Sequence, residues 1–450
     1  MRVLVCAKII KGELNPFDEA AIECALRLSD DVTVISMSPK TAENALKPLT
    51  RLGVNVVLVS DRIYAGSDTL ATAYILSKAI EKIGFDLILC GRQSLDGETA
   101  QVGPMLSQML NIPVITNAME VLSEEKHIQV RTRVDTKKIT LPALITLERS
   151  LMLRFASIFS KPKEIVCWSN EDVGCDTLKC GLKGSPTRVL ETFENEKGKR
   201  NCQFIEKKDL LPLIEHLKQQ EPVVITNKKT EKKLKSVWAV GKEVIEKAYE
   251  ISENVVYITP TDPRKIALRA KEEKPDVILW NADSWGRKNA PIAAAILDTG
   301  LCADCTLLET DGDQLFMYRP AEGGNITAKI KCIRKPQMAT IRTKSSCAEI
   351  IVSAGRGVKD KLNEVEVFAK SIGAEFAASR GLVDTNLVSY DKQIGLTGKT
   401  VNSKIYIAVG ISGAVHHTCA IEECMAVIAI NPDRNARIFQ YADYGIVSEF

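Results

Sequence analysis

Residues 393–418 read Gln393-Ile394-Gly395-Leu396-Thr397-Gly398-Lys399, then the apolar run Ile405-Tyr406-Ile407-Ala408-Val409, then Gly410-Ile411-Ser412-Gly413-Ala414-Val415-His416-His417-Thr418. An apolar run followed by small and hydroxyl residues predicts a buried strand that ends in a tight turn before a helix. Backbone N–H groups of such a turn can approach an anion at the helix N-terminus. The two histidines fall inside the turn, where they can flank the ring of a cofactor.

Length and composition predict a globular chain of about three domains. Of its 450 residues, 45% are apolar and 5% are aromatic, and the net charge is +3. These values argue against base-stacking or carbohydrate-binding surfaces, and against binding to nucleic acid or a membrane. No apolar run approaches the ~18 residues that span a bilayer, and Met1–Cys6 has no signal-peptide pattern. A soluble, cytoplasmic protein is expected.

The thirteen cysteines are dispersed, and most lie inside apolar runs. Buried thiols in a reducing compartment explain this distribution. Cys302-Ala303-Asp304-Cys305 is a lone C-x-x-C without a second pair or a nearby histidine, so no metal site is predicted.

Short apolar strands alternate with amphipathic helices along most of the chain, which predicts parallel sheets covered on both faces. Strands are expected at Val3–Lys8, Val32–Met37, Val54–Val59 and Asp86–Cys90, and again from Ser236 and from Glu349. Period-two stretches at His127–Val134 and Lys138–Leu147 predict an antiparallel pair.

The chain also contains an internal repeat. Asp86 begins an apolar run and is followed by Ser94, and Asp276 begins another and is followed at the same spacing by Ser284. This repeat predicts two homologous α/β domains related by a pseudo-twofold axis.

Three further motifs follow predicted strands near the C-terminus. Ser353-Ala354-Gly355-Arg356-Gly357-Val358-Lys359 suits a pyrophosphate, although a helix-capping turn looks similar. Ser379-Arg380 and Asn431-Pro432-Asp433 end two other strands. Together with residues 393–418, these motifs resemble, in order and spacing over residues 349–450, the FAD-binding domain of the electron transfer flavoprotein α-subunit.

The resemblance implies that FAD is bound by Arg356, Ser379, Arg380, Gln393, Ile394, Gly395, Leu396, Thr397, Gly398, Ser412, Gly413, Ala414, Val415, His416, His417, Asn431, Asp433, Asp443 and Glu449. It assigns Arg380 to the isoalloxazine, Thr397 to flavin N5 and His417 to the pyrimidine edge. In the loops around residues 393–418 the chain departs from the family at two positions, and Glu449 stands where the family often has Asp. Leu396 replaces a residue that is commonly polar, and His416 replaces a glutamine.

The N-terminal part resembles the β-subunit of the same family, through Asn15-Pro16-Phe17-Asp18 and the segment Gly91–Pro104. A plain helix start also explains Asn15-Pro16. The resemblance implies a second adenine nucleotide, either AMP or FAD. Its expected site comprises Cys6, Asn15, Asp18, Asp68, Thr69, Asp96, Thr99, Gln101, Val102 and Gly103.

The chain is therefore identified as a fusion of a β-subunit-like and an α-subunit-like part. We expect two pseudo-symmetric Rossmann-like domains of the adenine nucleotide α-hydrolase type and a C-terminal FAD-binding α/β domain. The expected boundaries are 1–168, 237–348 and 349–450, with a connecting arm at 169–236. The segment Glu148–Lys163 is either a partner-docking loop or a buried strand and turn.

The expected function is electron transfer on FAD, with no catalytic residue of its own. The partner is a flavoprotein dehydrogenase of the acyl-CoA dehydrogenase type. A further hypothesis is electron bifurcation from NADH, with ferredoxin, flavodoxin or a quinone reductase as acceptor. The alternative is a non-redox regulatory protein that binds adenine nucleotides. A stand-alone NAD(P)H oxidoreductase is disfavoured, because no G-x-G-x-x-G turn with a ribose-binding acid is present.

Overall fold

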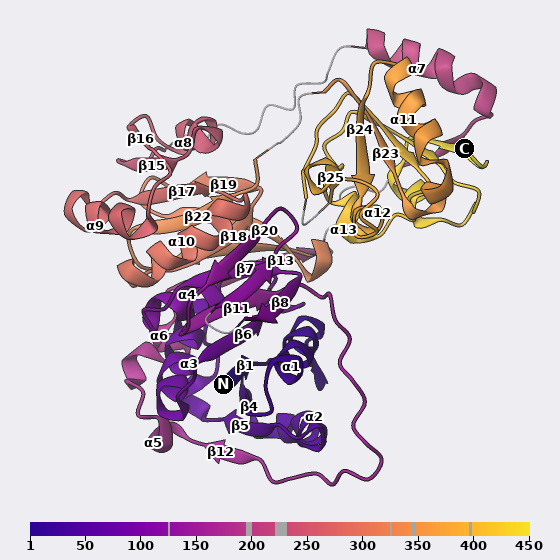
Figure 1. Cartoon of the computed structure of the whole chain (residues 1–450). Helices are drawn as coiled ribbons and strands as arrows, with labels where there is room; N and C mark the ends of the chain where they lie inside the picture. The colour runs from indigo at the N-terminus through magenta and orange to yellow at the C-terminus, as the bar shows by residue number, and fades with distance from the viewer. Residues whose placement is uncertain (125–126, 195–199, 221–231, 325, 344–347, 396–397) are drawn as a thin grey trace. The chain divides into compact units, whose positions relative to one another are not determined.

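The computed structural model describes residues 1–124, 127–194, 200–220, 232–324, 326–343, 348–395 and 398–450. The chain divides into two compact units (Figure 1). The first contains Met1–Thr192, Thr230–Glu322 and Ala328–Ile341, and the second contains Phe193–Lys229, Gly323–Thr327 and Arg342–Phe450. Both units are built on parallel sheets flanked by helices, which confirms the predicted α/β class.

A seven-stranded sheet organises the N-terminal part of the first unit. Its order is β12-β5-β4-β1-β6-β11-β7, and all neighbours are parallel. The strands are β1 (Val3–Cys6), β4 (Val32–Met37), β5 (Asn55–Val59), β6 (Leu87–Gly91), β7 (Val114–Ala118), β11 (Ala143–Leu147) and β12 (Val166–Trp168). The four strands predicted here from apolar runs are confirmed as β1, β4, β5 and β6.

Helices cover both faces of this sheet because its strands are apolar on both sides. They are α1 (Pro16–Leu28), α2 (Glu43–Leu46), α3 (Thr69–Ile83) and α4 (Val102–Met109). Helix α1 packs on the face that carries Val5 and Leu89, whereas α3 and α4 pack on the face that carries Leu4 and Ile88. A short hairpin, β2 (Ile9–Ile10) and β3 (Glu13–Leu14), connects β1 to α1.

The predicted pairing of His127–Val134 with Lys138–Leu147 is only half right. The antiparallel strands β8 (Glu120–Ser123), β9 (Ile128–Arg131) and β10 (Thr136–Ile139) form a separate three-stranded sheet. The second stretch is divided at Pro142, beyond which β11 enters the parallel sheet between β6 and β7. Proline has no N–H, so it cannot continue a hydrogen-bonded ladder.

The remainder of the first unit repeats five of these strands. Its parallel sheet has the order β16-β15-β17-β22-β18, which matches β4-β1-β6-β11-β7. The strands are β15 (Val237–Val240), β16 (Val255–Ile258), β17 (Val277–Asn281), β18 (Leu301–Cys305) and β22 (Gln337–Ile341), and the helices are α8 (Ile245–Ile251), α9 (Pro263–Glu273) and α10 (Ser284–Leu297). The pseudo-symmetric pair of domains is thereby confirmed.

The two repeated halves also share their hydrogen bonds. Asp86 accepts the N–H of Arg2 at 2.7 Å, and Asp276 accepts the N–H of Ser236 at 3.1 Å, so each repeated aspartate joins the starts of two adjacent strands. The edge strands β7 and β18 both carry a register shift. The halves meet through α4 and α10, whose Leu106 and Ala293 belong to one apolar core.

Residues 169–236, expected as a connecting arm, contain regular structure in both units. Helices α5 (Asn170–Val173) and α6 (Gly181–Gly184) belong to the first unit. Strand β13 (Thr187–Glu194) opens a four-stranded sheet of order β13-β21-β20-β19, with β19 (Leu307–Thr310), β20 (Leu315–Ala321) and β21 (Ile326–Cys332). Strand β14 (Gln203–Phe204) and helix α7 (Leu210–Gln219) belong to the second unit.

The second unit has one seven-stranded parallel sheet of order β14-β28-β27-β26-β23-β24-β25. Its other strands are β23 (Ile350–Ala354), β24 (Glu375–Ser379), β25 (Gln393–Ile394), β26 (Ile405–Val409), β27 (Ala426–Ile430) and β28 (Tyr444–Ile446), and its other helices are α11 (Leu362–Ser371), α12 (Arg380–Val383) and α13 (Val415–Thr418). From β25 to β28 the strands follow the dinucleotide-binding order 3-2-1-4-5-6. None of the described helices combines the length and apolarity needed to cross a bilayer.

Residues 200–219 complete the core of this unit. Strand β14 extends the sheet beside β28. Arg200 forms an ion pair with Asp443, and its guanidinium donates to the carbonyl oxygen of Glu422 at 3.2 Å. Helix α7 buries Leu210, Ile214 and Leu217 in the same core as Val352 and Ile407.

Helix α7 offers a matched pair of leucines. Leu217→Ala is expected to destabilise the second unit by about 2–5 kcal/mol, because it leaves a cavity beside a core side chain that is 3% exposed. Leu211→Ala, at a position that is 54% exposed, should change stability by less than about 0.5 kcal/mol. Hydrogen exchange of the amides in residues 350–430 measures the stability change that each substitution causes. Equal effects of the two substitutions would contradict the packing of α7 on this core.

Candidate functional site

The strand order of the second unit reverses beside β23, and this creates a switch point at the carboxyl edge of the sheet. Strand β23 lies at the centre, and the chain continues first to β24 on one side and later to β26 on the other. The register aligns Ala354 with both Ala378 and Val409, so three strands end side by side. Ligands of open parallel sheets bind where the chain order reverses, beyond the carboxyl ends of the strands.

Glycines let the backbones that follow β23 and β26 approach each other closely. A Cβ at Gly355 would lie 2.2 Å from the carbonyl oxygen of Gly410. The Gly357 N–H donates to that same oxygen at 3.1 Å. Gly410 has φ +63°, which disfavours any residue with a Cβ, and a Cβ there would lie 3.0 Å from Val358 Cγ1. The result is a cradle of backbone without side chains at the switch point.

Two arginines border this cradle. Arg356 follows the first glycine and is exposed, and its Cδ would lie 3.0 Å from a Cβ at Gly381. Arg380 begins α12 directly after β24, and its Nε lies 3.4 Å from Asp384 Oδ2. Ser379, the last residue of β24, pairs with Ile394 of β25. Cationic side chains beside a backbone that carries no side chains suit a pyrophosphate.

The turn after β26 alternates exposed and buried positions. Ser412, Ala414 and His416 are exposed, whereas Gly413 and His417 are buried. Gly413 has φ +85°, and a Cβ there would lie 2.2 Å from the backbone nitrogen of Ile438. Val415 begins α13. Of the two predicted histidines, His416 is therefore the one whose side chain is open to solvent.

His417 is instead buried between α13 and the sheet. Its Nε2 lies 2.8 Å from the hydroxyl of Tyr406, a fully buried residue of β26. Burial lowers the pKa of His417 to about 4, although the backbone of Ile394 favours the charged form. The imidazole is consequently neutral at pH 7, and it supplies a polar group without a fixed charge.

The described residues on either side of Leu396 and Thr397 are hydrogen-bonded to one another beside this turn. Gly395 donates its N–H to the carbonyl oxygen of Lys399 at 3.1 Å, and Gly398 donates to that of Gly395 at 2.9 Å. A Cβ at Gly395 would lie 2.9 Å from the carbonyl oxygen of His416, so the loop touches the turn. Leu396 and Thr397, which the sequence placed in the site, lie outside the described residues.

Asn431 and Asp433 follow β27 and join the same edge. Asn431 Nδ2 donates to the carbonyl oxygen of Ile411 at 3.0 Å, and Asn431 Oδ1 accepts the N–H of Asp433 at 2.9 Å. Asp443 is separated from this group. It precedes β28, accepts the N–H of Val427 at 2.8 Å, and therefore lies at the amino edge of the sheet. Glu449 pairs with Lys361 at 3.3 Å.

The residues predicted to hold a second nucleotide form two hydrogen-bonded groups in the first unit. In one group, Asp18 accepts the N–H of Lys8 at 2.7 Å and that of Gly91 at 3.1 Å. Burial raises the pKa of Asp18 to about 7, although both bonds lower it. The Lys8 ammonium lies 2.6 Å from Asp96. Cys6 of β1 lies opposite Cys90 of β6 in the strand register, and both are free thiols.

Asn15 belongs to the same group. Its Nδ2 donates to the carbonyl oxygen of Gln93 at 2.9 Å. Its Oδ1 is buried and accepts no hydrogen bond from the described residues. A buried acceptor without a donor is costly, and a ligand can supply the donor.

The other group joins the starts of α3 and α4 to each other and to the neighbouring residues Thr187 and Leu301. Asp68 caps α3 through the N–H of Leu70 at 3.0 Å and also accepts the hydroxyl of Thr187 at 2.5 Å. Thr69 donates to Gln101 Oε1 at 2.7 Å, and Gln101 Nε2 donates to the carbonyl oxygen of Leu301 at 3.0 Å.

Three more of the predicted residues flank this second group. Thr99 is half-buried, and Val102 begins α4. A Cβ at Gly103 would lie 2.5 Å from Thr146 Cγ2.

Sequence reasoning missed a buried ion pair and two partners of predicted residues. Arg92 and Glu148 lie 2.6 Å apart with side chains 7% and 2% exposed. Each directly follows a strand, β6 or β11, and these strands are neighbours. The missing signal was strand order, which the sequence does not state. Lys8 and Tyr406 were missed because each is polar but stands in or beside an apolar strand.

Comparison with known proteins covers both parts of the chain. The profile of the electron transfer flavoprotein domain matches residues 3–172 and 221–370, and that of the electron transfer flavoprotein FAD-binding domain matches residues 346–422. The β-subunit of electron transfer flavoprotein from Thermoanaerobacterium thermosaccharolyticum is 42% identical over 40% of this chain and 75% of its own length. The α-subunit from that organism is 39% identical over 43% of this chain and 73% of its own length. Subunit CarD of the caffeyl-CoA reductase-Etf complex of Acetobacterium woodii is 34% identical over 43% of this chain and 87% of its own length.

The buried histidine generates a pH prediction. Because the pKa of His417 is near 4 in the folded unit and about 6.5 in an unfolded chain, stability is full above pH 6.5 and falls as the pH drops toward 4. The wild type should lose about 2 kcal/mol more than His417→Gln between pH 7 and pH 5. Denaturant unfolding of the second unit at both pH values measures the difference. His416→Gln, at the exposed neighbour, is the control and should behave as wild type; parallel losses in all three proteins would refute the buried neutral histidine.

Proposed function

This chain belongs to the electron transfer flavoprotein family, and from that premise we propose that it carries electrons on FAD bound at the switch point of the second unit. The observation that carries the proposal is the glycine cradle between β23 and β26, bordered by Arg356 and Arg380. The flavin would supply the redox chemistry, and the chain would hold it and adjust its potential.

The residues at the edge of this sheet fit such a cofactor. Arg356 and the backbone after β23 and β26 would hold the pyrophosphate, where side chains are absent and positive charge is present. Asn431 and Asp433 would contact the adenosine portion. His416 and the described part of the loop after Gln393 would flank the flavin ring, since the two segments touch at Gly395.

Arg380 and His417 would affect the flavin differently. The Arg380 side chain is 34% exposed and carries a permanent charge. A cation near a flavin favours its electron-rich form by about 1–4 kcal/mol at ~4 Å, depending on solvent exposure. His417 is neutral at pH 7, so it would add only dipolar stabilisation.

A second adenine nucleotide would bind at the carboxyl ends of β1 and β6. The buried Asn15 Oδ1 without a donor supports this proposal, as does the cation of Lys8 at the same strand ends. AMP would make the chain a simple carrier. A second FAD would allow oxidation of NADH and division of its electrons between two acceptors.

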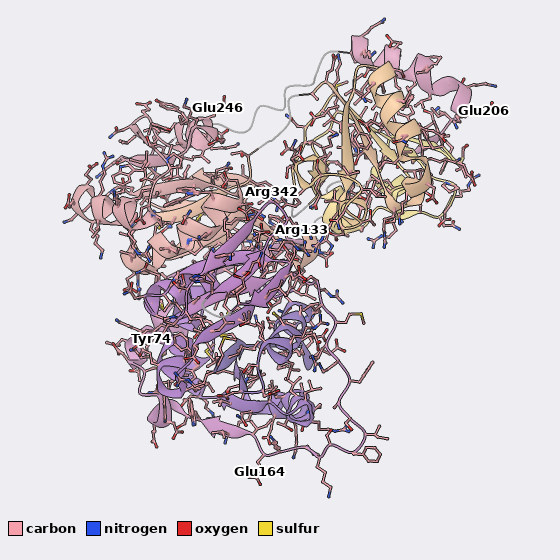
Figure 2. The ribbon with its side chains drawn as sticks, in the orientation of Figure 1. Tyr74, Arg133, Glu164, Glu206, Glu246 and Arg342 are labelled. Atoms are coloured by element: carbon pink, nitrogen blue, oxygen red, sulfur yellow. The ribbon has the colours of Figure 1, made fainter. Side chains whose placement is uncertain are left out.

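The segment between β11 and β12 would dock the partner enzyme. Figure 1 shows that it runs outside the sheet as an extended strap, and Figure 2 labels Glu164 near its end. Met152, Phe155, Ile158 and Phe159 are 85–100% exposed. The guanidinium of Arg51 holds the strap through the carbonyl oxygens of Ser157 and Ser160. Exposed aromatic and aliphatic side chains on a tethered backbone suit a protein interface.

The proposed partner is a flavoprotein dehydrogenase that acts on acyl-CoA substrates. The relative CarD supports this class, because its name places it in a caffeyl-CoA reductase complex. The further acceptor is a ferredoxin, a flavodoxin or a quinone reductase.

Removing the positive charge at Arg380 tests the flavin site. Arg380→Gln should shift the flavin potential downward, equivalent to about one to three decades in the reduction equilibrium constant. Reductive titration against dyes of known potential measures it. The control is Lys370→Gln on α11, a residue that pairs with Glu366. An unchanged flavin potential in Arg380→Gln would show that Arg380 does not lie near the flavin.

The strap can be tested separately from flavin binding. Phe155→Ser combined with Phe159→Ser should reduce electron exchange with an acyl-CoA dehydrogenase at least about tenfold, because aromatic anchors dominate interfaces. FAD content and Tm should stay unchanged, since both rings are at least 87% exposed. Val134→Ser, at a 74% exposed position outside the strap, is the control. Unaltered exchange in the double variant would assign docking to another surface.

A further inference from the structure

The strap between β11 and β12, residues 148–165, begins with an inner and an outer row of side chains. Leu151 and Leu153 are half-buried and pack against the apolar core to which α1 contributes. Met152 and Phe155 are 88% and 100% exposed. Side chains of an extended segment alternate between its two faces, so packing of the inner row turns the outer row toward solvent.

A buried carboxylate on α1 holds this part of the strap. The Glu23 side chain is only 4% exposed. Its Oε2 accepts the backbone N–H of Arg154 at 3.2 Å and Arg154 Nε at 2.9 Å, and its Oε1 accepts Arg154 Nη2 at 2.9 Å. Bidentate contacts between a guanidinium and a carboxylate are strong and directional. Both the backbone and the side chain of Arg154 are therefore fixed on α1.

A second arginine, from α1 itself, binds the same carboxylate. Arg27 Nε lies 2.8 Å from Glu23 Oε1, one helical turn away. Hydrogen bonds from Arg154 lower the pKa of Glu23 to about 2, although burial opposes this shift, and Arg27 lowers it further. The carboxylate is thus ionised at neutral pH. It compensates two guanidinium groups, of which only one belongs to the strap.

The most exposed side chain of the strap lies between two points of attachment. Phe155 directly follows Arg154, which Glu23 holds, and precedes the carbonyl oxygens of Ser157 and Ser160, which Arg51 holds. A segment that is ordered before association spares the complex part of the entropy cost of ordering it.

We propose that Glu23 is a positioning residue for partner docking, which holds the strap so that Phe155 is presented to a flavoprotein dehydrogenase before the two proteins meet. The inference rests on the docking function proposed above for the strap. Glu23 is buried and acts through Arg154. Without its negative charge, Arg27 and Arg154 would repel each other, and the strap would lose its attachment to α1.

Hydrogen exchange of the strap amides in the free full chain tests the attachment without any partner. In Glu23→Gln, exchange in residues 151–160 should become at least about tenfold faster, because charge-assisted hydrogen bonds are lost. Arg154→Met removes the same contact from the strap and should have the same effect, which keeps the test decisive if Glu23→Gln does not fold. Arg27→Met is the matched control, since it removes the other arginine of this carboxylate and should change exchange by less than about twofold. Exchange that is unchanged when the contact is removed would overturn the proposal.

Electron exchange with an acyl-CoA dehydrogenase tests the consequence for docking. Glu23→Gln should raise the KM for this chain at least about fivefold and leave kcat within about twofold, because the strap affects binding and not the flavin. Arg27→Met should retain both constants. A raised KM in Arg154→Met but not in Glu23→Gln would show that Arg154 contacts the partner directly, and would overturn the positioning role.

The double variant Phe155→Ser/Phe159→Ser distinguishes a failure of this inference from a failure of the docking function. Adding Glu23→Gln to it should raise the KM by less than about twofold more, because both changes act through the strap. A full additive rise would overturn the inference. An unaltered KM in the phenylalanine variant would refute docking by the strap and this inference with it, whereas a raised KM there and a normal KM in Glu23→Gln would overturn this inference alone. All samples are compared at equal FAD content, so loss of flavin is not counted as loss of docking.

Discussion

The close approach of two backbones at Gly355 and Gly410 is the constraint on which the second unit depends. Any Cβ at Gly355 would lie 2.2 Å from a carbonyl oxygen of the facing turn, so a larger residue would push apart the ends of two adjacent central strands. Those strands, β23 and β26, are the pair at which the chain order reverses. Two arginines, Arg356 and Arg380, border the same contact. The fold and the proposed cofactor site thus share one set of glycines.

In the first unit, two copies of one α/β arrangement are joined in a single core. Helices α4 and α10 pack together, and Gln101 reaches across to the carbonyl oxygen of Leu301. The copies have diverged where they meet. A carboxylate at Asp304 pairs with Arg287, whereas an amide, Asn117, stands at the equivalent register shift of β7. Residues 200–219 extend the sheet and the core of the second unit.

Local patterns in the sequence predicted most strands, the repeat and the carboxyl-edge cluster, because apolar runs and glycine turns are local signals. They did not predict that Pro142 divides a stretch into two sheets, because this depends on which strand is the neighbour. Strand order also decides that Asp443 lies at the amino edge and that Arg92 meets Glu148. His417 was expected beside the flavin, and its bond to Tyr406 is a tertiary contact between a helix and a strand. The expected arm at 169–236 illustrates the same limit, since low apolar density did not reveal α7 as a core helix.

We propose that the second unit holds a flavin and that the first holds another adenine nucleotide. The most direct measurement is to denature the purified full chain and quantify the released FAD and AMP per chain by chromatography. We expect one FAD per chain together with one further adenine nucleotide, which would be AMP in a simple carrier and a second FAD in a bifurcating one. A chain that releases no flavin, even after incubation with FAD, would contradict it.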